Sequence, residues 1–108
     1  MTGKDKVPEL TKGEFDDFVS EGLVVIDFYA DWCMPCVMMA PIVEELSEKF
    51  EGKIKFGKVS VDDNPDLVKK FEVNAMPTFV LFENGEVKEK FIGGMPLEEF
   101  EEKLNSFL

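Results

Sequence analysis

The chain has 108 residues, of which 44% are hydrophobic and 11 are Phe, and this supplies the core of one compact domain over residues 1–108 but not of a second. Its formal charge of −11 comes from 23 acidic and 12 basic side chains. This charge argues against nucleic acid or anionic lipid as a ligand, because a protein that binds them uses Lys and Arg to neutralise their phosphates. No segment approaches the roughly 18 consecutive apolar residues of a membrane span and residues 1–12 lack the apolar core of a signal peptide, so we expect a protein of the cytoplasm. Separately, we expect it to be a monomer.

The first predicted elements are a helix and a buried strand. Thr11 and Glu14 have the spacing of a capping box, and apolar residues then recur at helical spacing, which predicts a helix over about residues 12–21. Gly22 ends this helix, and residues 23–29 follow as a nearly unbroken apolar run. Such a run is typical of a central strand that is buried on both faces.

A second helix and a second strand follow. Apolar residues recur with a helical period between residues 33 and 50, and Pro41 inside this pattern should bend the helix. Residues 54–61 alternate as a strand does. Asn64-Pro65 then signals the start of a short helix that carries the apolar residues of the segment 67–71. The apolar positions of the second helix are Val37, Ala40, Ile42, Val43, Leu46 and Phe50.

The last third of the chain predicts a hairpin and a final helix. Residues 78–82 and 86–92 form strands around Asn84-Gly85, which is the strongest short-range signal for a β-hairpin. Pro96 then opens an amphipathic helix. Its apolar face consists of Leu97, Phe100, Leu104 and Leu108. Strands that alternate with helices form a β-α-β unit, so the expected fold class is α/β, with a central mixed β-sheet flanked by helices on both faces.

The two cysteines, Cys33 and Cys36, lie in the run Ala-Asp-Trp-Cys-Met-Pro-Cys over residues 30–36. A tetrahedral zinc site needs about four ligands, so only two pooled chains could hold zinc or an iron–sulfur cluster, and we expect no metal in one chain. A purely structural disulfide would restrict the unfolded chain little across so short a loop, and inert thiols are a further alternative. A redox-active pair is our main hypothesis.

The position of the pair favours redox chemistry. Cys33 falls where the strand gives way to the second helix, and the unpaired N–H groups and dipole of a helix N-terminus favour a thiolate there. Residues at i and i+3 are close enough to form a disulfide, and Pro35 is tolerated in the first turn. We expect Cys33, at the exposed end, to be the nucleophile and Cys36 to resolve the mixed disulfide. Met34 and Pro35 carry no charge that would stabilise the thiolate further, so the pair should lean toward reducing its substrates.

Asp27 places a carboxylate within the apolar run over residues 23–29. Burial there would penalise the charged form and raise its pKa, which suits a general base for Cys36 that later acts as an acid. Alternatively, Asp27 lies at a strand edge and reaches water. Lys58, in the next predicted strand, is either the counter-charge of Asp27 or a solvated lysine.

With these residues assembled, the sequence resembles the thioredoxin family along nearly its whole length. The resemblance is carried by residues 25–36 together with Ala40-Pro41, Val61-Asp62-Asp63-Asn64-Pro65, Met76-Pro77-Thr78 and Asn84-Gly85, and these segments are far more specific than the cysteine spacing alone. It implies the thioredoxin fold and the reduction of protein disulfides. It also implies Cys33 as nucleophile, Cys36 as resolving thiol, Asp27 as buried proton carrier and a cis Met76–Pro77 peptide that faces the cysteines.

Two residues depart from the usual pattern of the family, because Met34 stands where Gly is common and Tyr29 replaces a usual Trp. The resemblance implies that the position of Met34 tunes both the reduction potential and the choice of partner. Trp32, Met34, Met76 and Met95 could form an adaptable apolar rim for docking substrates, although some of these methionines could instead fill the core. The expected substrate-binding residues are Trp32, Met34, Pro35, Met76, Pro77 and Gly93.

These expectations describe a protein-disulfide reductase that is itself reduced again by a thioredoxin reductase. A disulfide oxidase or isomerase is a second hypothesis, and a redox-inactive binding or assembly module with the same fold is a third. The chain carries no G-x-G-x-x-G fingerprint, so we expect it to bind no NADPH, flavin or other cofactor itself.

Overall fold

The computed structural model describes residues 7–108, which contain four helices and four strands. The helices are α1 (Lys12–Val19), α2 (Met34–Lys49), α3 (Pro65–Lys70) and α4 (Leu97–Asn105). The strands are β1 (Leu23–Tyr29), β2 (Ile54–Ser60), β3 (Thr78–Glu83) and β4 (Glu86–Ile92). All were predicted, and α1 ends two residues earlier than expected. Residues 1–6, part of the segment in which we expect no signal peptide, lie outside the described residues.

Local hydrogen bonds explain where the first elements begin and turn. The carboxylate of Glu14 accepts a hydrogen bond from the backbone N–H of Thr11 at 2.8 Å, as a capping box requires. The hairpin turn uses Asn84 and Gly85 at φ of 52° and 87°, the left-handed conformations for which Asn-Gly is favoured. The Asn84 side chain also accepts a hydrogen bond from the N–H of Gly22 at 2.8 Å, which ties the start of β1 to the hairpin.

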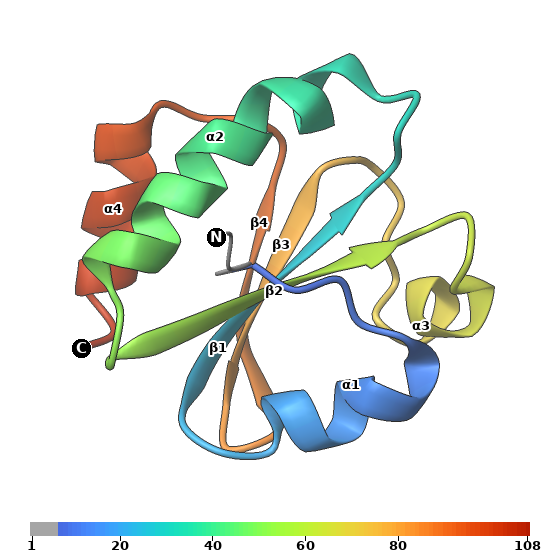
Figure 1. Ribbon diagram of the computed structural model, residues 1–108, viewed down its shortest axis with the longest axis horizontal. Helices are drawn as coiled ribbons and strands as arrows, with labels where there is room; N and C mark the ends of the chain where they lie inside the picture. The colour runs from blue at the N-terminus through green and yellow to red at the C-terminus, as the bar shows by residue number, and fades with distance from the viewer. Residues whose placement is uncertain (1–6) are drawn as a thin grey trace.

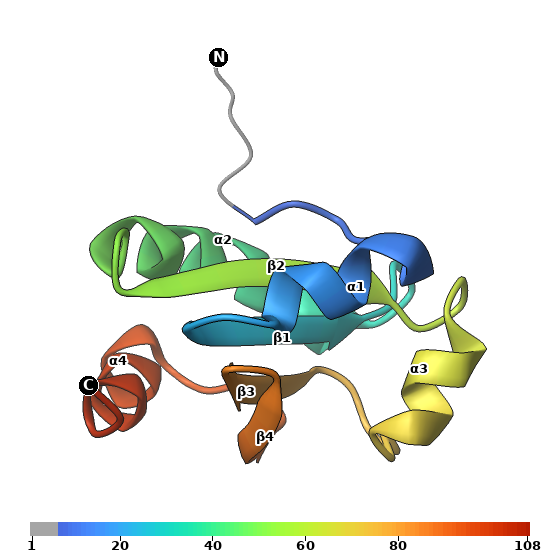
Figure 2. The same ribbon diagram turned by 90° about the horizontal axis from the view of Figure 1, so that it is seen from below.

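The four strands form one mixed sheet in the order β2-β1-β3-β4. β1 pairs with β2 in parallel and with β3 antiparallel, and β4 pairs antiparallel with β3. Helices α2 and α4 pack on one face of the sheet, and α1 and α3 pack on the other (Figures 1 and 2). The predicted α/β architecture is therefore confirmed.

The edge of β2 also pairs with the segment that precedes α1, which the sequence analysis did not predict. The N–H of Leu10 donates to the carbonyl of Lys58 at 2.9 Å, and the N–H of Lys58 donates to the carbonyl of Pro8 at 3.0 Å. Glu9 and Lys58 form an isolated parallel bridge. This pairing covers one exposed edge of the sheet and brings Glu9 close to the ends of β1 and β2.

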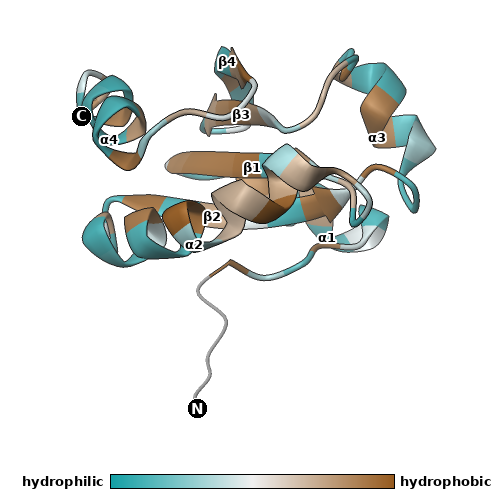
Figure 3. Cartoon of the chain, turned by 90° about the horizontal axis from the view of Figure 1, so that it is seen from above, coloured by the Kyte–Doolittle hydropathy of each residue, from teal (hydrophilic) through white to brown (hydrophobic). Residues whose placement is uncertain are grey.

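Two apolar clusters fill the space between the sheet and its helices, and each helix carries apolar and polar residues on different sides (Figure 3). The cluster under α2 and α4 is the larger, and it contains Val25, Met39, Val43, Leu46, Phe56, Phe79, Leu81, Phe91, Phe100 and Leu104, among others. The cluster under α1 and α3 includes Phe15, Val19, Val24, Ile26, Phe28, Val59, Leu67, Val80 and Phe82. Alternate residues of β1 enter opposite clusters, as expected for a central strand.

Three apolar positions of the predicted helical patterns lie outside the core. Val37 and Ala40 are exposed, because the buried face of α2 runs through Cys36 and Met39 instead, one position earlier on the helix. Leu108 is 56% exposed, because α4 ends at Asn105 and the last residue lies beyond its apolar face. The remaining positions of that face, Leu97, Phe100 and Leu104, pack in or against the larger cluster.

Candidate redox site

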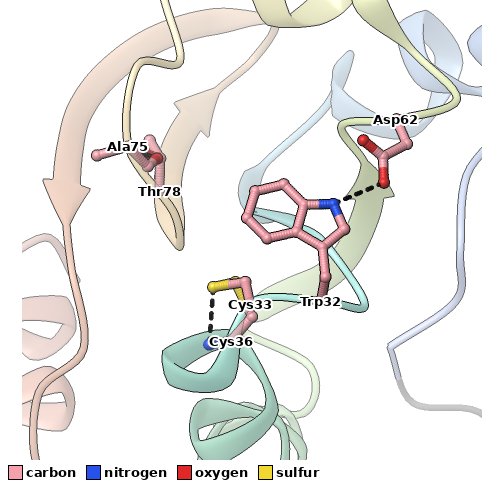
Figure 4. Close-up of a disulfide and its surroundings, with 6 residues drawn as sticks. All are labelled: Trp32, Cys33, Cys36, Asp62, Ala75 and Thr78. Carbon is pink, nitrogen blue, oxygen red and sulfur yellow. Dashed lines mark hydrogen bonds between the residues drawn. A yellow bond between two sulfur atoms is a disulfide. The ribbon is translucent and has the colours of Figure 1, made fainter.

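Cys33 and Cys36 form a disulfide at the N-terminus of α2 (Figure 4). β1 ends at Tyr29, the chain turns, and Cys33 becomes the N-cap residue of the helix. Cys36 lies in the first turn, with its Cα atom 5.3 Å from that of Cys33, and Pro35 precedes it at a position that needs no intrahelical N–H donor. The strand-to-helix transition therefore brings the two sulfur atoms together.

The backbone of the first turn supplies a hydrogen bond to the first sulfur. The N–H of Cys36 donates to Sγ of Cys33 at 3.2 Å. This N–H is one of the donors that a helix N-terminus leaves without an intrahelical acceptor, and such donors stabilise negative charge. A thiolate at Cys33 would therefore be favoured.

Exposure does not separate the two cysteines, contrary to the expectation that Cys33 lies at the exposed end. Cys33 is 6% exposed and Cys36 is 5% exposed. Both pack with Ala30 in a small apolar cluster against which Tyr29 and Met76 rest. Their positions on the helix, and the hydrogen bond that only Sγ of Cys33 accepts from the helix, distinguish them instead.

The loop before β3 lies across from the disulfide. The predicted cis peptide between Met76 and Pro77 is present. The hydroxyl of Thr78 donates to the carbonyl of Ala75 at 2.6 Å and closes the turn around this peptide (Figure 4). The N–H of Gly93 donates to the carbonyl of Pro77 at 2.8 Å, so the end of β4 is joined to the same loop.

Asp27 lies on the α2 side of β1 and is buried. It is 6% exposed, and Oδ1 of its carboxyl group has no hydrogen-bond partner within residues 7–108. Burial raises the pKa of Asp27 from 3.8 to about 7, and the positive charge of Lys58 lowers it in part. The predicted burial and raised pKa are confirmed, and the alternative of a solvated strand edge is wrong.

A pocket of about 200 Å³ connects the carboxyl group with the second cysteine. Asp27, Cys36, Tyr29 and Lys58 all line it. Although most of its lining is apolar, Asp27, Asp31 and Lys58 place charged groups on its wall, and a cavity of this size has room for water molecules, which can carry a proton between groups that do not touch. The arrangement therefore allows proton exchange between Asp27 and Cys36.

Lys58 faces Asp27 without pairing with it. The two are partners in the parallel register of β1 and β2, and Lys58 is half-buried. Among the described residues, however, the salt bridges do not include one between them. The Nζ of Lys58 lies instead 5.6 Å from the ring centroid of Tyr29.

Exposed apolar side chains surround the disulfide on the solvent side. Trp32 is 68% exposed and Met34 is 67% exposed, and the indole N–H of Trp32 donates to Asp62 at 3.0 Å (Figure 4). Val37 and Met38 add to this surface with 52% and 66% exposure. Met34, Val37 and Met38 stand at i, i+3 and i+4 and therefore share one face of α2.

The structure separates the four residues of the predicted apolar rim. Trp32 and Met34 are on it, and Met76 is half-buried against the cysteine cluster. Met95 packs against the larger core, where its N–H lies 3.5 Å from Sδ of Met39, so the core alternative applies to it. The sequence analysis did not name Met38 as part of this rim. Helical spacing alone indicates its place, because Met38 stands four residues after Met34 and therefore lies on the same face of the helix.

A protein-family model described as Thioredoxin matches residues 6–106. The chain belongs to the thioredoxin family. Thioredoxins of Staphylococcus saprophyticus, Staphylococcus haemolyticus and Staphylococcus aureus are each 39% identical to it over 102 residues. Each match covers 94% of this chain and 98% of the relative.

As a member of the thioredoxin family, the chain is a thiol–disulfide oxidoreductase and acts as a protein-disulfide reductase. Membership also implies protein disulfides as substrates and a reductase as partner. An oxidase, an isomerase or a redox-inactive module is not favoured. Within the described part of the chain, no helix has the length and apolar character needed to cross a bilayer, and no three His, Cys, Asp or Glu residues gather as a metal site.

Proposed function

We propose that the chain reduces protein disulfides with Cys33 as the attacking thiol and Cys36 as the resolving thiol. The observation that supports this order is the hydrogen bond from the Cys36 N–H to Sγ of Cys33 at the helix N-terminus. The reductase first converts the disulfide to a dithiol. The Cys33 thiolate then attacks one sulfur of the substrate disulfide, so that a mixed disulfide forms and one substrate thiolate leaves.

The second exchange releases the substrate. The Cys36 thiolate attacks Sγ of Cys33, the mixed disulfide breaks, and the second substrate thiolate leaves. The Cys33–Cys36 disulfide is formed again while the substrate has gained two electrons and, from water, two protons. The two cysteines thus carry electrons from the reductase to the substrate.

Asp27 would take the proton from Cys36 before the second exchange. Three features support this role: its burial, its place with Cys36 on one pocket, and a pKa of about 7, which suits a base that works near neutral pH. Water in the pocket would carry the proton. Lys58 would be the charge that limits the rise in the pKa of Asp27.

The substrate would dock over the disulfide through the exposed apolar side chains and the loop across from them. Large apolar surfaces left in water near a reactive group are typical of binding sites for protein segments. Methionine side chains adapt to partners of different shape, which suits a reductase of many substrates. The residues that we propose for this docking are Trp32, Met34, Pro35, Met76, Pro77 and Gly93.

We propose further that the chain acts as one domain over residues 1–108 and as a monomer in the cytoplasm. Both apolar clusters lie against the same sheet, which supports a single folding unit. A protein that reduces disulfides suits a compartment in which thiols are kept reduced. Sedimentation of the purified protein would show whether it is a monomer.

The two roles are tested by dithiothreitol-driven reduction of insulin and by trapping. Cys33→Ser should abolish activity above the dithiothreitol background, and Cys36→Ser should accumulate a mixed disulfide with the substrate, visible by mass spectrometry without reductant. Leu108→Ser, at an exposed position beyond α4, is the control and should leave activity unchanged. Equal activity of Cys33→Ser and the parent, or a trapped complex formed only by Cys33→Ser, would overturn the assignment.

A further inference from the structure

The position of Lys58 is unexpected for a lysine that faces a buried carboxylate. Asp27 and Lys58 face each other in the β1–β2 register, and both line the pocket behind Cys36. An ammonium on a four-carbon side chain would ordinarily turn toward a buried carboxylate. Here its Nζ lies 5.6 Å from the Tyr29 ring centroid, and Oδ1 of Asp27 has no hydrogen-bond partner within residues 7–108.

Tyr29 is placed to compete for this ammonium. It lies two residues after Asp27 on β1, so both side chains point to the same side of the sheet. Its ring is half-buried and packs against the cysteine cluster. The negative face of an aromatic ring attracts an ammonium within about 6 Å of its centroid.

The Tyr29 side chain is held at both ends. Its ring rests on the cysteine cluster, and its hydroxyl group interacts with the Glu9 carboxylate. Burial first, and then Glu9, raise the pKa of the Tyr29 hydroxyl group, so the ring stays neutral. Glu9 is itself fixed by its bridge to Lys58 at the edge of β2.

The other charged groups around Asp27 are acidic. Glu44 of α2 lines a small cavity of about 30 Å³ with Asp27 and Lys58, and Asp31 lines the larger pocket. Glu9 lies on the far side of Tyr29. Among the described residues that line the two cavities, Lys58 is the only cation, so its position decides how much positive charge Asp27 experiences.

We propose that Tyr29 is a positioning residue whose ring holds the Lys58 ammonium and so keeps it from pairing with the buried Asp27 carboxylate. The proposal rests on the proton-transfer role that we propose for Asp27. An opposite charge within 4–6 Å lowers the pKa of a carboxyl group by about 1–3 units. When the ring is removed, Lys58 can close on Asp27, and the carboxyl group should lose its proton at lower pH.

The test measures the titration of Asp27 directly in the oxidised protein, from the chemical shift of its carboxyl carbon against pH. Tyr29→Leu removes the ring, and Tyr29→Phe is the matched control that keeps it. We expect Tyr29→Leu to lower the titration midpoint by about one pH unit and Tyr29→Phe to leave it within a few tenths of a unit. Tyr29→Met replaces the Leu variant if circular dichroism shows that the Leu variant does not fold.

The same pair of variants is then made with Lys58→Met. Without the ammonium, Tyr29→Leu should no longer lower the midpoint. The proposal would be overturned if Tyr29→Leu left the titration midpoint of Asp27 unchanged in the protein that keeps Lys58. It would also be overturned if Tyr29→Leu lowered the midpoint equally with Lys58 and with Lys58→Met, because the ring would then act by excluding water.

The rate of mixed-disulfide resolution against pH separates this inference from the role of Asp27 on which it rests. If both hold, the pH at which the rate is half-maximal falls with the titration midpoint. A midpoint that falls while the rate profile stays fixed would support the position of Lys58 and overturn proton transfer by Asp27. If Asp27→Asn also leaves the pH dependence of this rate unchanged, that result alone would overturn proton transfer by Asp27.

Discussion

Replacing Asp27 by Asn should make the stability of this protein much less dependent on pH. The pKa of Asp27 is about 7 in the folded protein, whereas its ordinary value is 3.8. Between these values the folded protein binds more protons than the unfolded chain does, so the free energy of unfolding falls as pH rises from about 4 to about 7. Below this window the neutral carboxyl group adds no penalty.

The size of the effect follows from the difference between the two values. About three pH units at about 1.36 kcal/mol each correspond to about 4 kcal/mol. This is an upper value, because water in the neighbouring pocket solvates the charged carboxylate in part. Asp27→Asn removes only this titration, so the variant should gain stability relative to the parent by up to about 4 kcal/mol between about pH 4 and about pH 8.

Urea unfolding of both oxidised proteins at several pH values, followed by far-UV circular dichroism, measures this difference. All other carboxylates are shared, so their contributions cancel in the comparison. If the amide of the variant forms weaker hydrogen bonds, the free energy of unfolding changes by the same amount at every pH, so its dependence on pH is not affected. A stability difference that stays constant between pH 4 and pH 8 would refute the assignment of a raised pKa to Asp27.

Two further predictions concern the rim and the sheet edge. Replacing both Met34 and Met38 by Ser removes exposed apolar surface beside the disulfide. The change should raise KM for an apolar disulfide peptide about fivefold, from about 1 kcal/mol of lost burial, and an unaltered KM would argue against docking there. Lys90→Met removes hydrogen bonds of 2.8 and 3.2 Å to two carbonyls after α3 and should lower the free energy of unfolding by about 1–2 kcal/mol. Lys88→Met, which removes an exposed ion pair, should change it by about 0.5 kcal/mol or less, and equal losses in thermal or urea unfolding would contradict this account of Lys90.

Features that depend on neighbouring residues were predicted well. The capping box at Thr11, the hairpin at Asn84-Gly85 and the disulfide spacing of Cys33 and Cys36 each involve residues at most three positions apart. Backbone preferences and short hydrogen bonds decide such features, and they act in the same way wherever the segment lies. The burial of Asp27 was predictable for a similar reason, because apolar residues on both sides of it require a strand covered on both faces.

Several features that depend on distant segments were not predicted. Val37 and Met38 are exposed because no other part of the described chain packs on that side of α2, although a helical period alone suits Val37 to a core. The pairing of residues 8–10 with β2 needs an open sheet edge, which exists only after the strand order is set. The sequence analysis left open whether Lys58 is the counter-charge of Asp27 or lies in solvent. It did not consider the ring of Tyr29, over which the ammonium group lies.

The sequence by itself therefore determined the elements, the redox pair and the carboxyl group behind it, because local patterns and the desolvation of a charge require no knowledge of the rest of the fold. Only the tertiary structure decided which groups share the pocket. Packing α2 against β1 brings Cys36 and Asp27 to one cavity, and the parallel pairing of β1 with β2 adds Lys58 beside Tyr29. The electrostatic field on Asp27 depends on these through-space distances, and sequence separation does not contain them.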